Sequence, residues 1–201
     1  MRRVAVSGIG VISPLGNSAA EVLAQARAGR SGVRRLVTPF SSRLSAPMAA
    51  TASFDEAVCA EPGKARMLDR FSLLALIAAN QAVQASHGAL ADVDRTRAGV
   101  FVGTGMGGTL TMDSGYQTLY GEQSDRIKPF TILMGMHNAA AAWIGIEHGL
   151  RGPNMTYSTA CSSSTVAIGE AWMRVACGQL DVALAGGSEA PLSPGSMKAW
   201  V

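Results

Sequence analysis

Cys161 stands where a strand-like run gives way to an apolar, helix-like segment. The run 154–160 reads Asn-Met-Thr-Tyr-Ser-Thr-Ala, and three serines follow the cysteine before a mostly apolar stretch that reaches about Cys177. This pattern predicts a strand, a sharp turn and a helix whose first turn carries Cys161. At a helix start, free backbone N–H groups and the macrodipole favour a thiolate over a thiol. The same N–H groups can stabilise the oxyanion that forms when a thiolate attacks a thioester carbonyl.

Two interpretations of Cys161 compete. Free cysteines often serve as small core residues, and nothing in the residue type alone excludes that role. A strand–turn–helix elbow, however, is a known way to expose a nucleophile in acyl-transfer enzymes. The segment 166–176 is apolar on most faces, which predicts a buried helix and places the cysteine at the floor of a cleft. The serine-rich turn therefore favours the nucleophile.

A cysteine nucleophile usually needs a proton acceptor or a charge partner, and the histidines are the candidates. His87 and His148 each precede a glycine at the predicted end of a helix, where an imidazole simply complements the helix dipole. His137 lies inside a predicted helix, and no spacing aims it at Cys161. The sequence thus predicts a nucleophile without an assigned base.

Composition excludes several classes of protein. The chain has 201 residues, of which 48% are hydrophobic and 15% charged, as expected for a globular protein with a substantial core. The net charge of +3 is scattered, so we expect no nucleic-acid partner. The three cysteines show neither framework spacing nor a CxxC pair, and we expect no metal and no cofactor. Gly8, Gly10 and Pro14 interrupt the N-terminal apolar run, which argues against a signal or membrane helix and favours a cytoplasmic protein.

Strand-like and helix-like segments alternate along the chain. Short apolar strands are predicted at 3–7, 99–103 and 182–185. Loops with small irregular elements are predicted through 30–66, and a loop with one helical turn from Pro191 to Val201. Helices are predicted from Asn17 or Ser18 to about Ala28, from Leu68 to about His87, and from Thr131 to about His148. This order predicts one α/β domain over 1–201 with a largely parallel sheet.

The glycine-rich run 103–108 formally matches GxGxxG after a strand, as in dinucleotide-binding proteins. No second strand with a terminal acidic residue follows at the required distance, so the match is weak. The plainer interpretation is a crowded turn, where only glycine lets the backbone approach another segment.

Several of these runs together resemble the active-site half of β-ketoacyl-[acyl-carrier-protein] synthases, within the thiolase-like condensing enzymes. The cysteine motif is specific for that group, and the resemblance spans nearly the whole chain. The matching segments are 4–10, 13–16, 68–71, 102–108, 152–154, 159–164, 167–171 and 185–190, with Gly178 and Asp181.

The resemblance implies the N-terminal half of a layered αβαβα fold and a reaction in two steps. Cys161 would take an acyl group from an acyl carrier protein, and malonyl-carrier protein would then lose CO2 and attack that thioester, in fatty-acid or polyketide synthesis. Gly105, Met106 and Gly107 would lie beside the acyl channel, with Met106 limiting chain length. The resemblance also implies substrate-binding roles for Ser162 and for the segment 130–137, which would line the acyl pocket of the partner subunit across a dimer interface. Its residues of interest are Phe130, Met134, Met136 and His137.

The resemblance further implies contacts with partners. Lys64, Arg66, Arg126 and Lys128 fall in regions that meet the acidic carrier protein, although ordinary solvated cations are the alternative. A homodimer or heterodimer would form through the strand before Cys161.

The chain has about half the length expected for such an enzyme. The resemblance places two catalytic histidines and a glycine-rich gate loop in the other half, so we expect the complete reaction to need that half. We expect a second polypeptide to carry it, and apolar helix faces to be exposed here. The alternatives are a non-catalytic partner subunit, an inactive fragment of a condensing enzyme, or a coenzyme A-dependent thiolase.

Overall fold

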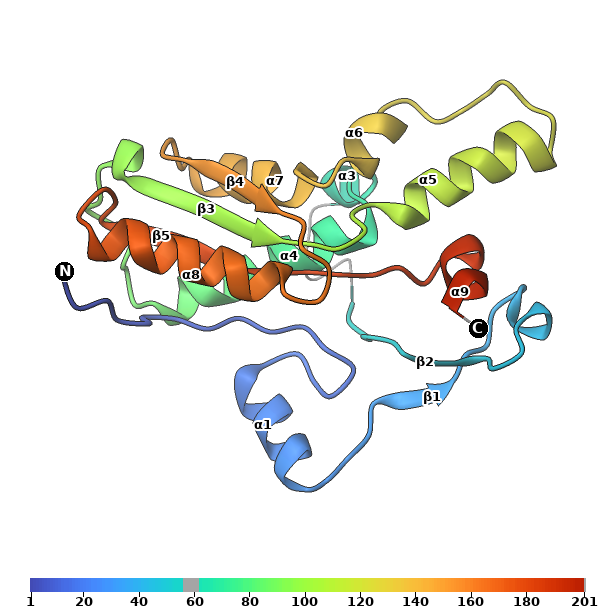
Figure 1. Ribbon diagram of the computed structural model, residues 1–201, viewed down its shortest axis with the longest axis horizontal. Helices are drawn as coiled ribbons and strands as arrows, with labels where there is room; N and C mark the ends of the chain where they lie inside the picture. The colour runs from blue at the N-terminus through green and yellow to red at the C-terminus, as the bar shows by residue number, and fades with distance from the viewer. Residues whose placement is uncertain (56–61, 201) are drawn as a thin grey trace.

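The computed structural model describes residues 1–55 and 62–200, and its centre is a three-stranded parallel sheet (Figure 1). Its strands are β3 (Ala98–Gly103), β4 (Asn154–Tyr157) and β5 (Val182–Gly187), in the order β4-β3-β5. Both neighbours of β3 pair with it in parallel register, for example Val102 with Thr156 and with Gly186. The parallel α/β architecture predicted from the alternation of segments is confirmed.

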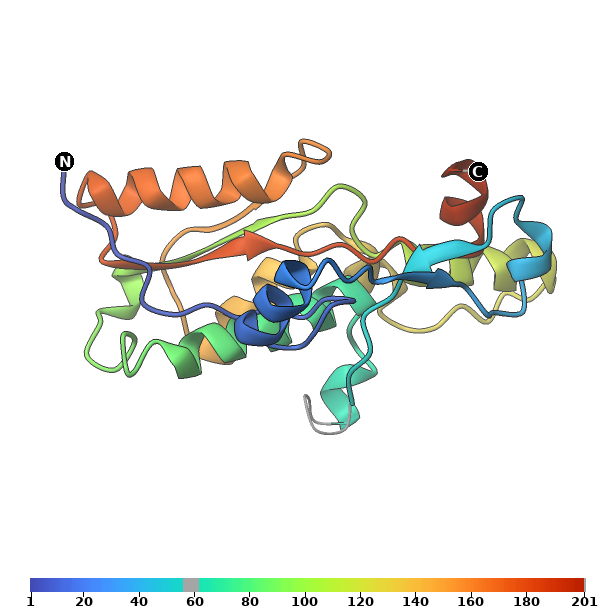
Figure 2. The same ribbon diagram turned by 90° about the horizontal axis from the view of Figure 1, so that it is seen from below.

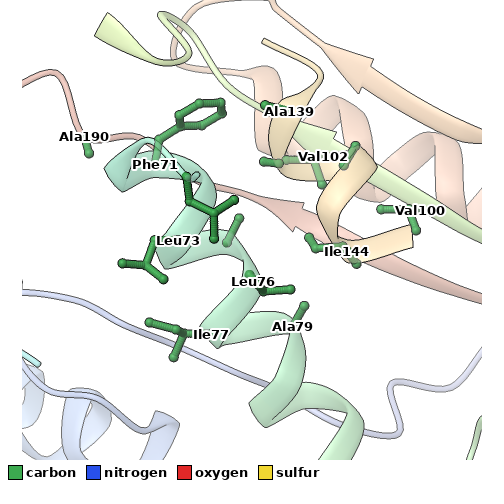
Figure 3. Packing of buried hydrophobic residues seen from close by; sticks show 14 residues of the cluster. Phe71, Leu73, Leu76, Ile77, Ala79, Val100, Val102, Ala139, Ile144 and Ala190 are labelled. Carbon is green, nitrogen blue, oxygen red and sulfur yellow. The ribbon is translucent and has the colours of Figure 1, made fainter. Parts of the chain in front are cut away.

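Helices cover both faces of this sheet (Figure 2). Helix α8 (Ser163–Ala176) lies on one face, and α4 (Arg70–Ala85) with α7 (Ala139–His148) lies on the other. The alternation of side chains along β3 explains the division, because successive residues of a strand point to opposite faces. Phe101 packs in a cluster with Ala167 and Ala171 of α8, whereas Val100 and Val102 join the larger core built with α4 and α7 (Figure 3).

The remaining described elements surround this centre. An antiparallel ribbon of two strands, β1 (Val33–Arg35) and β2 (Met48–Ala50), lies apart from the main sheet. The shorter helical elements are α1 (Ala19–Arg27), η1 (Ser41–Arg43), α3 (Pro62–Ala65), η2 (Arg95–Arg97), α5 (Thr109–Tyr116), the π-helical turn η3 (Gln117–Gly121), α6 (Thr131–Gly135) and α9 (Pro194–Trp200). In residues 1–55 and 62–200, no helix combines the length and the apolar character needed to span a bilayer.

Side-chain caps explain where two predicted helices begin. Ser18 accepts a hydrogen bond from the backbone N–H of Glu21 at the start of α1, as the sequence predicted. Asp69 caps α4 in the same way through the N–H of Phe71. Helix α4 ends at Ala85, close to the predicted stop near Gly88.

The strand predicted at 3–7 is wrong. This segment pairs with no strand of the described chain, and the side chain of Val6 is 81% exposed. The segment that follows runs against α4, because Gly8 and Gly10 have no side chain to hold it away from the backbone of Ala82 and Ala78. One backbone group next to it bonds to this helix and not to a strand: the N–H of Val11 donates to the side chain of Gln81 on α4.

The helix predicted from Thr131 to His148 is in fact two helices, α6 and α7, separated by an extended Met136. The break follows from the contact that Gly135 makes with the glycine-rich run. Its carbonyl accepts the N–H of Gly108 at 3.2 Å, and a side chain at Gly135 would meet Met112. The C-terminal segment differs too, since α9 has seven residues where only one turn was expected.

An ion pair at the amino-terminal end of the sheet fixes the connection from α8 to β5. Arg97 donates to both carboxylate oxygens of Asp181, at 2.6 and 2.8 Å, and to the carbonyl of Gly178 at 2.9 Å. These hydrogen bonds lower the pKa of Asp181 and raise that of Arg97. Helix α8 is thereby held at its far end, while its first residues face the carboxyl ends of the strands.

Candidate active site

Cys161 lies in the turn between β4 and α8, and its side chain is exposed. Helix α8 begins at Ser163, with Ser162 as its N-cap. Cys161 therefore precedes the helix, and the prediction that it lies in the first turn is wrong. The reason is the backbone of Ala160, which adopts a left-handed conformation with φ of 52°. Such a conformation is strained for a residue with a side chain and is characteristic of functional turns.

Two serines hold this elbow in place. The hydroxyl of Ser163 donates to the carbonyl of Ala160 at 2.6 Å and accepts the N–H of Thr159 at 2.8 Å, and Ser163 is only 3% exposed. The hydroxyl of Ser162 donates to the carbonyl of Thr159. Sequence reasoning selected Ser162 as a substrate-binding residue and missed Ser163, although the serine run itself was the available signal. The role of Ser162 toward a substrate stays a prediction.

Glycines at the ends of two strands let the start of α8 approach the sheet. A side chain at Gly103, the last residue of β3, would lie 2.2 Å from the backbone carbonyl carbon of Ser163. A side chain at Gly187, the last residue of β5, would lie 2.3 Å from Cβ of Ser164. These contacts leave no room for even a methyl group, so the position of the elbow depends on both glycines.

The glycine-rich run is the crowded turn that the sequence suggested. Gly107 has a φ of 60° and packs against His137, while Gly108 packs against the backbone of Met134. The N–H groups of Gly105 and Met106 donate to the carboxylate of Glu189. Because a side chain of the protein already uses these two donors, they are not free for a phosphate, which argues against the dinucleotide alternative.

The structure therefore brings the run 103–108 together with the segment 134–137, both of which were predicted to bind substrate. Met106, Gly105 and Met134 are half-buried, whereas Met136 and His137 are exposed. Phe130 combines a left-handed φ of 66° with a side chain that is 59% exposed. More than half of this phenylalanine therefore faces solvent in the described chain, on a backbone conformation that side chains rarely adopt.

In residues 1–55 and 62–200, no hydrogen bond joins a histidine to Cys161, so the base stays unassigned. His87 follows α4 in a left-handed conformation, and His148 is the last residue of α7, so both lie at or just after the helix ends where the sequence placed them. Burial lowers the pKa of His148 and so favours its neutral form. Residues 1–55 and 62–200 also contain no group of three acidic, histidine or cysteine side chains that could hold a metal ion.

The four cations predicted to meet a carrier protein lie in two regions. Lys64 of α3 forms an ion pair with Glu147 of α7 at 2.5 Å and is partly buried, while Arg66 is exposed. Arg126 and Lys128 are exposed in the loop before α6. Lys128 and Met134 also line a pocket of about 220 Å³ between α5 and this loop.

Comparison with known proteins places this geometry in a family. Residues 1–201 match the family described as "Beta-ketoacyl synthase, N-terminal domain". The chain is 31% identical over 96% of its length to 3-oxoacyl-[acyl-carrier-protein] synthase 2 of Staphylococcus aureus strain N315, covering 47% of that protein. It is 34% identical over 99% of its length to nodulation protein E of Rhizobium meliloti strain 1021, covering 50% of that protein.

Solved structures of ketosynthases share this fold. A complex of a type II polyketide synthase acyl-carrier protein with its ketosynthase bound to the hexaketide matches with a TM-score of 0.82 and 25% identity, over 100% of this chain and 54% of that chain. A β-ketoacyl synthase from Burkholderia phymatum STM815 matches with a TM-score of 0.75 and 26% identity, over 90% and 45% of the two chains.

The fold is thus that of one half of a thiolase-like ketosynthase. The chain belongs to the β-ketoacyl synthase family, as the resemblance of its motifs implied. It spans about half the length of the curated relatives it matches.

The close approach of Gly103 to Ser163 can be tested by substitution. We predict that Gly103→Ala destabilises the chain by about 1–3 kcal/mol, because the new methyl group overlaps the backbone of Ser163. It should also slow alkylation of Cys161 by iodoacetamide several-fold, as measured by mass spectrometry. Gly186→Ala is the matched control, since nothing lies within 4 Å of a side chain at that strand position. Equal effects of the two substitutions would contradict the proposed role of the close packing.

Proposed function

We propose that this chain is the nucleophile-bearing half of a β-ketoacyl-[acyl-carrier-protein] synthase. The observation that carries the proposal is the exposed Cys161 on a strained elbow at the amino-terminal end of α8. Non-catalytic partner subunits of condensing enzymes typically replace this nucleophile, so its retention favours the catalytic role. The family match over the full chain supports the same reading over a degradative thiolase.

In the first step, the sulfur of Cys161 attacks the carbonyl carbon of an acyl thioester. A new thioester forms on Cys161, and the carrier thiol leaves with the proton that the cysteine gave up. The start of α8 places its positive dipole end at the reacting carbonyl, where negative charge develops. In the second step, malonyl-carrier protein loses CO2, and the resulting carbanion attacks the carbonyl carbon of the acyl-cysteine thioester. The C–S bond to Cys161 then breaks, which frees the cysteine sulfur and leaves the β-ketoacyl product on the carrier protein. The histidines for decarboxylation would come from the other half of the enzyme.

Three surfaces would receive partners. Arg66, Arg126 and Lys128 are exposed and could meet the acidic carrier protein, whereas the Lys64 ammonium would have to be shared with Glu147. Strand β4 lies at the edge of the sheet, so its outer edge is suited to pairing with the same strand of a second subunit. Its position directly before Cys161 would put two active sites near one dimer interface.

The outer face of α8 supports a third contact, with the C-terminal half that the relatives carry. Ile168, Trp172 and Met173 are about half exposed on this face, while Ala167 and Ala171 are buried against the sheet. A helix that is apolar on both sides is normally buried on both sides. We infer that α8 is covered in the complete enzyme by that second half.

Acyl transfer to Cys161 gives the direct test of function. When the purified chain is incubated with an acyl-pantetheine thioester, we expect the intact mass to rise by one acyl group, because the first step uses only the cysteine and the elbow. Cys161→Ala should abolish the gain, whereas Cys177→Ala should retain it. Acylation that persists in Cys161→Ala would show that the nucleophile is assigned wrongly.

The covered-helix proposal predicts how the chain behaves alone. Exposed apolar area on α8 should make the isolated chain bind an apolar dye and self-associate. Replacing Ile168, Trp172 and Met173 together by serine should reduce both effects. Val37→Ser is the control, because Val37 is 88% exposed and follows β1, which pairs with β2 in a separate sheet. A chain that runs as a monomer on size-exclusion chromatography and binds no dye would argue against a missing cover.

A further inference from the structure

Glu189 links the ends of two neighbouring strands, β5 and β3. It follows β5, and its carboxylate reaches across to the turn that leaves β3. A single oxygen, Oε2, accepts the N–H of Gly105 at 2.6 Å and the N–H of Met106 at 3.1 Å. The hydroxyl of Thr104 lies 3.5 Å from both carboxylate oxygens and also accepts the N–H of Gly107 at 3.2 Å.

The turn held by Glu189 lies directly against the nucleophile elbow. A side chain at Gly105 would lie 3.9 Å from both Cα and the carbonyl oxygen of Ala160, the strained residue before Cys161. The carbonyl of Gly105 accepts the hydroxyl of Ser158 at 3.4 Å, which ties the turn to the segment after β4. Movement of the turn would therefore change the space beside Cys161.

The hydrogen-bond donors of the turn explain why the residue at position 189 is a carboxylate. Successive backbone N–H groups of a turn form a concave site that attracts an anion, and hydrogen bonds to a charged acceptor are the stronger ones. Glu189 fills that site from within the chain. Because Thr104 is 2% exposed, the hydroxyl below the turn is shielded from water and the whole turn is fixed from one side.

We propose that Glu189 is a positioning residue that sets which acyl groups Cys161 accepts, by holding the Gly105–Met106 turn against the elbow. This inference rests on the proposed acyl transfer to Cys161. Without the carboxylate, the turn loses two hydrogen bonds, and Met106, which the resemblance places beside the acyl channel, is no longer held by its backbone N–H. The size of the acyl group would then be poorly discriminated, while the sulfur itself would stay in place.

The test compares two reactions of the same sulfur. Acetyl-, octanoyl- and dodecanoyl-pantetheine report the acyl site, and iodoacetamide reports the cysteine alone, each followed by intact mass. In Glu189→Ala we expect the ratio of long-chain to short-chain acylation rates to change at least fivefold, with iodoacetamide labelling within about twofold of the unmodified chain. Glu189→Gln retains an oxygen acceptor and should keep a nearly normal ratio.

Each alternative outcome is decisive. If the ratio in Glu189→Ala is unchanged, or if all rates including alkylation fall in parallel, the residue has no positioning role toward the acyl site. If Glu189→Ala does not fold, Glu189→Asp replaces it: its shorter carboxylate should shift the ratio while Glu189→Gln does not, and two normal ratios would overturn the proposal. If the unmodified chain is alkylated but never acylated, the proposed function itself fails and this inference falls with it.

Discussion

The close approach of α8 to the carboxyl ends of β3 and β5 is the contact on which the candidate site depends. Gly103 and Gly187 bring the backbone of the sheet so near to Ser163 and Ser164 that no side chain fits between them. With the helix start fixed there, the chain leaving β4 must reverse within a few residues, and Ala160 takes the left-handed conformation that this reversal requires. The energy stored in that conformation is offset by the hydrogen bonds of Ser162 and Ser163. Cys161 is exposed as the consequence.

Much of the centre of the fold could be predicted from the sequence. The buried strand β3 is a continuous apolar run, and Ser18 is a typical N-cap residue at the start of α1. Both could be predicted because each signal lies within a few residues of the element. Cys161 was found in the same way, from the change of pattern around it. Only its place relative to the helix was wrong, since the strained Ala160 is set by packing against the sheet and leaves no mark in residue type.

The errors lie where distant segments decide local structure. The run 3–7 has the composition of a strand, but whether it pairs depends on a neighbour that no local pattern reveals. The break between α6 and α7 is imposed by the contact of Gly135 with Gly108, 27 positions earlier in the chain. Glu189 was passed over for the same reason: an acidic residue after a strand carries no sign that its carboxylate will hold a turn 84 residues away.

The proposed function requires that the start of α8 makes the sulfur of Cys161 reactive. A second cysteine, at the other end of the same helix, provides an internal control. Cys177, also exposed, is the C-cap of the same helix, so the two sulfurs lie at opposite ends of one dipole. Cys59 lies outside the described residues and is removed by the substitution Cys59→Ser. The rates at which iodoacetamide alkylates Cys161 and Cys177 can then be measured together by mass spectrometry at neutral pH and low salt. The account predicts that Cys161 reacts roughly tenfold faster when the chain is folded, and that the two rates converge in denaturant. Equal rates in the folded chain, or faster labelling of Cys177, would contradict it.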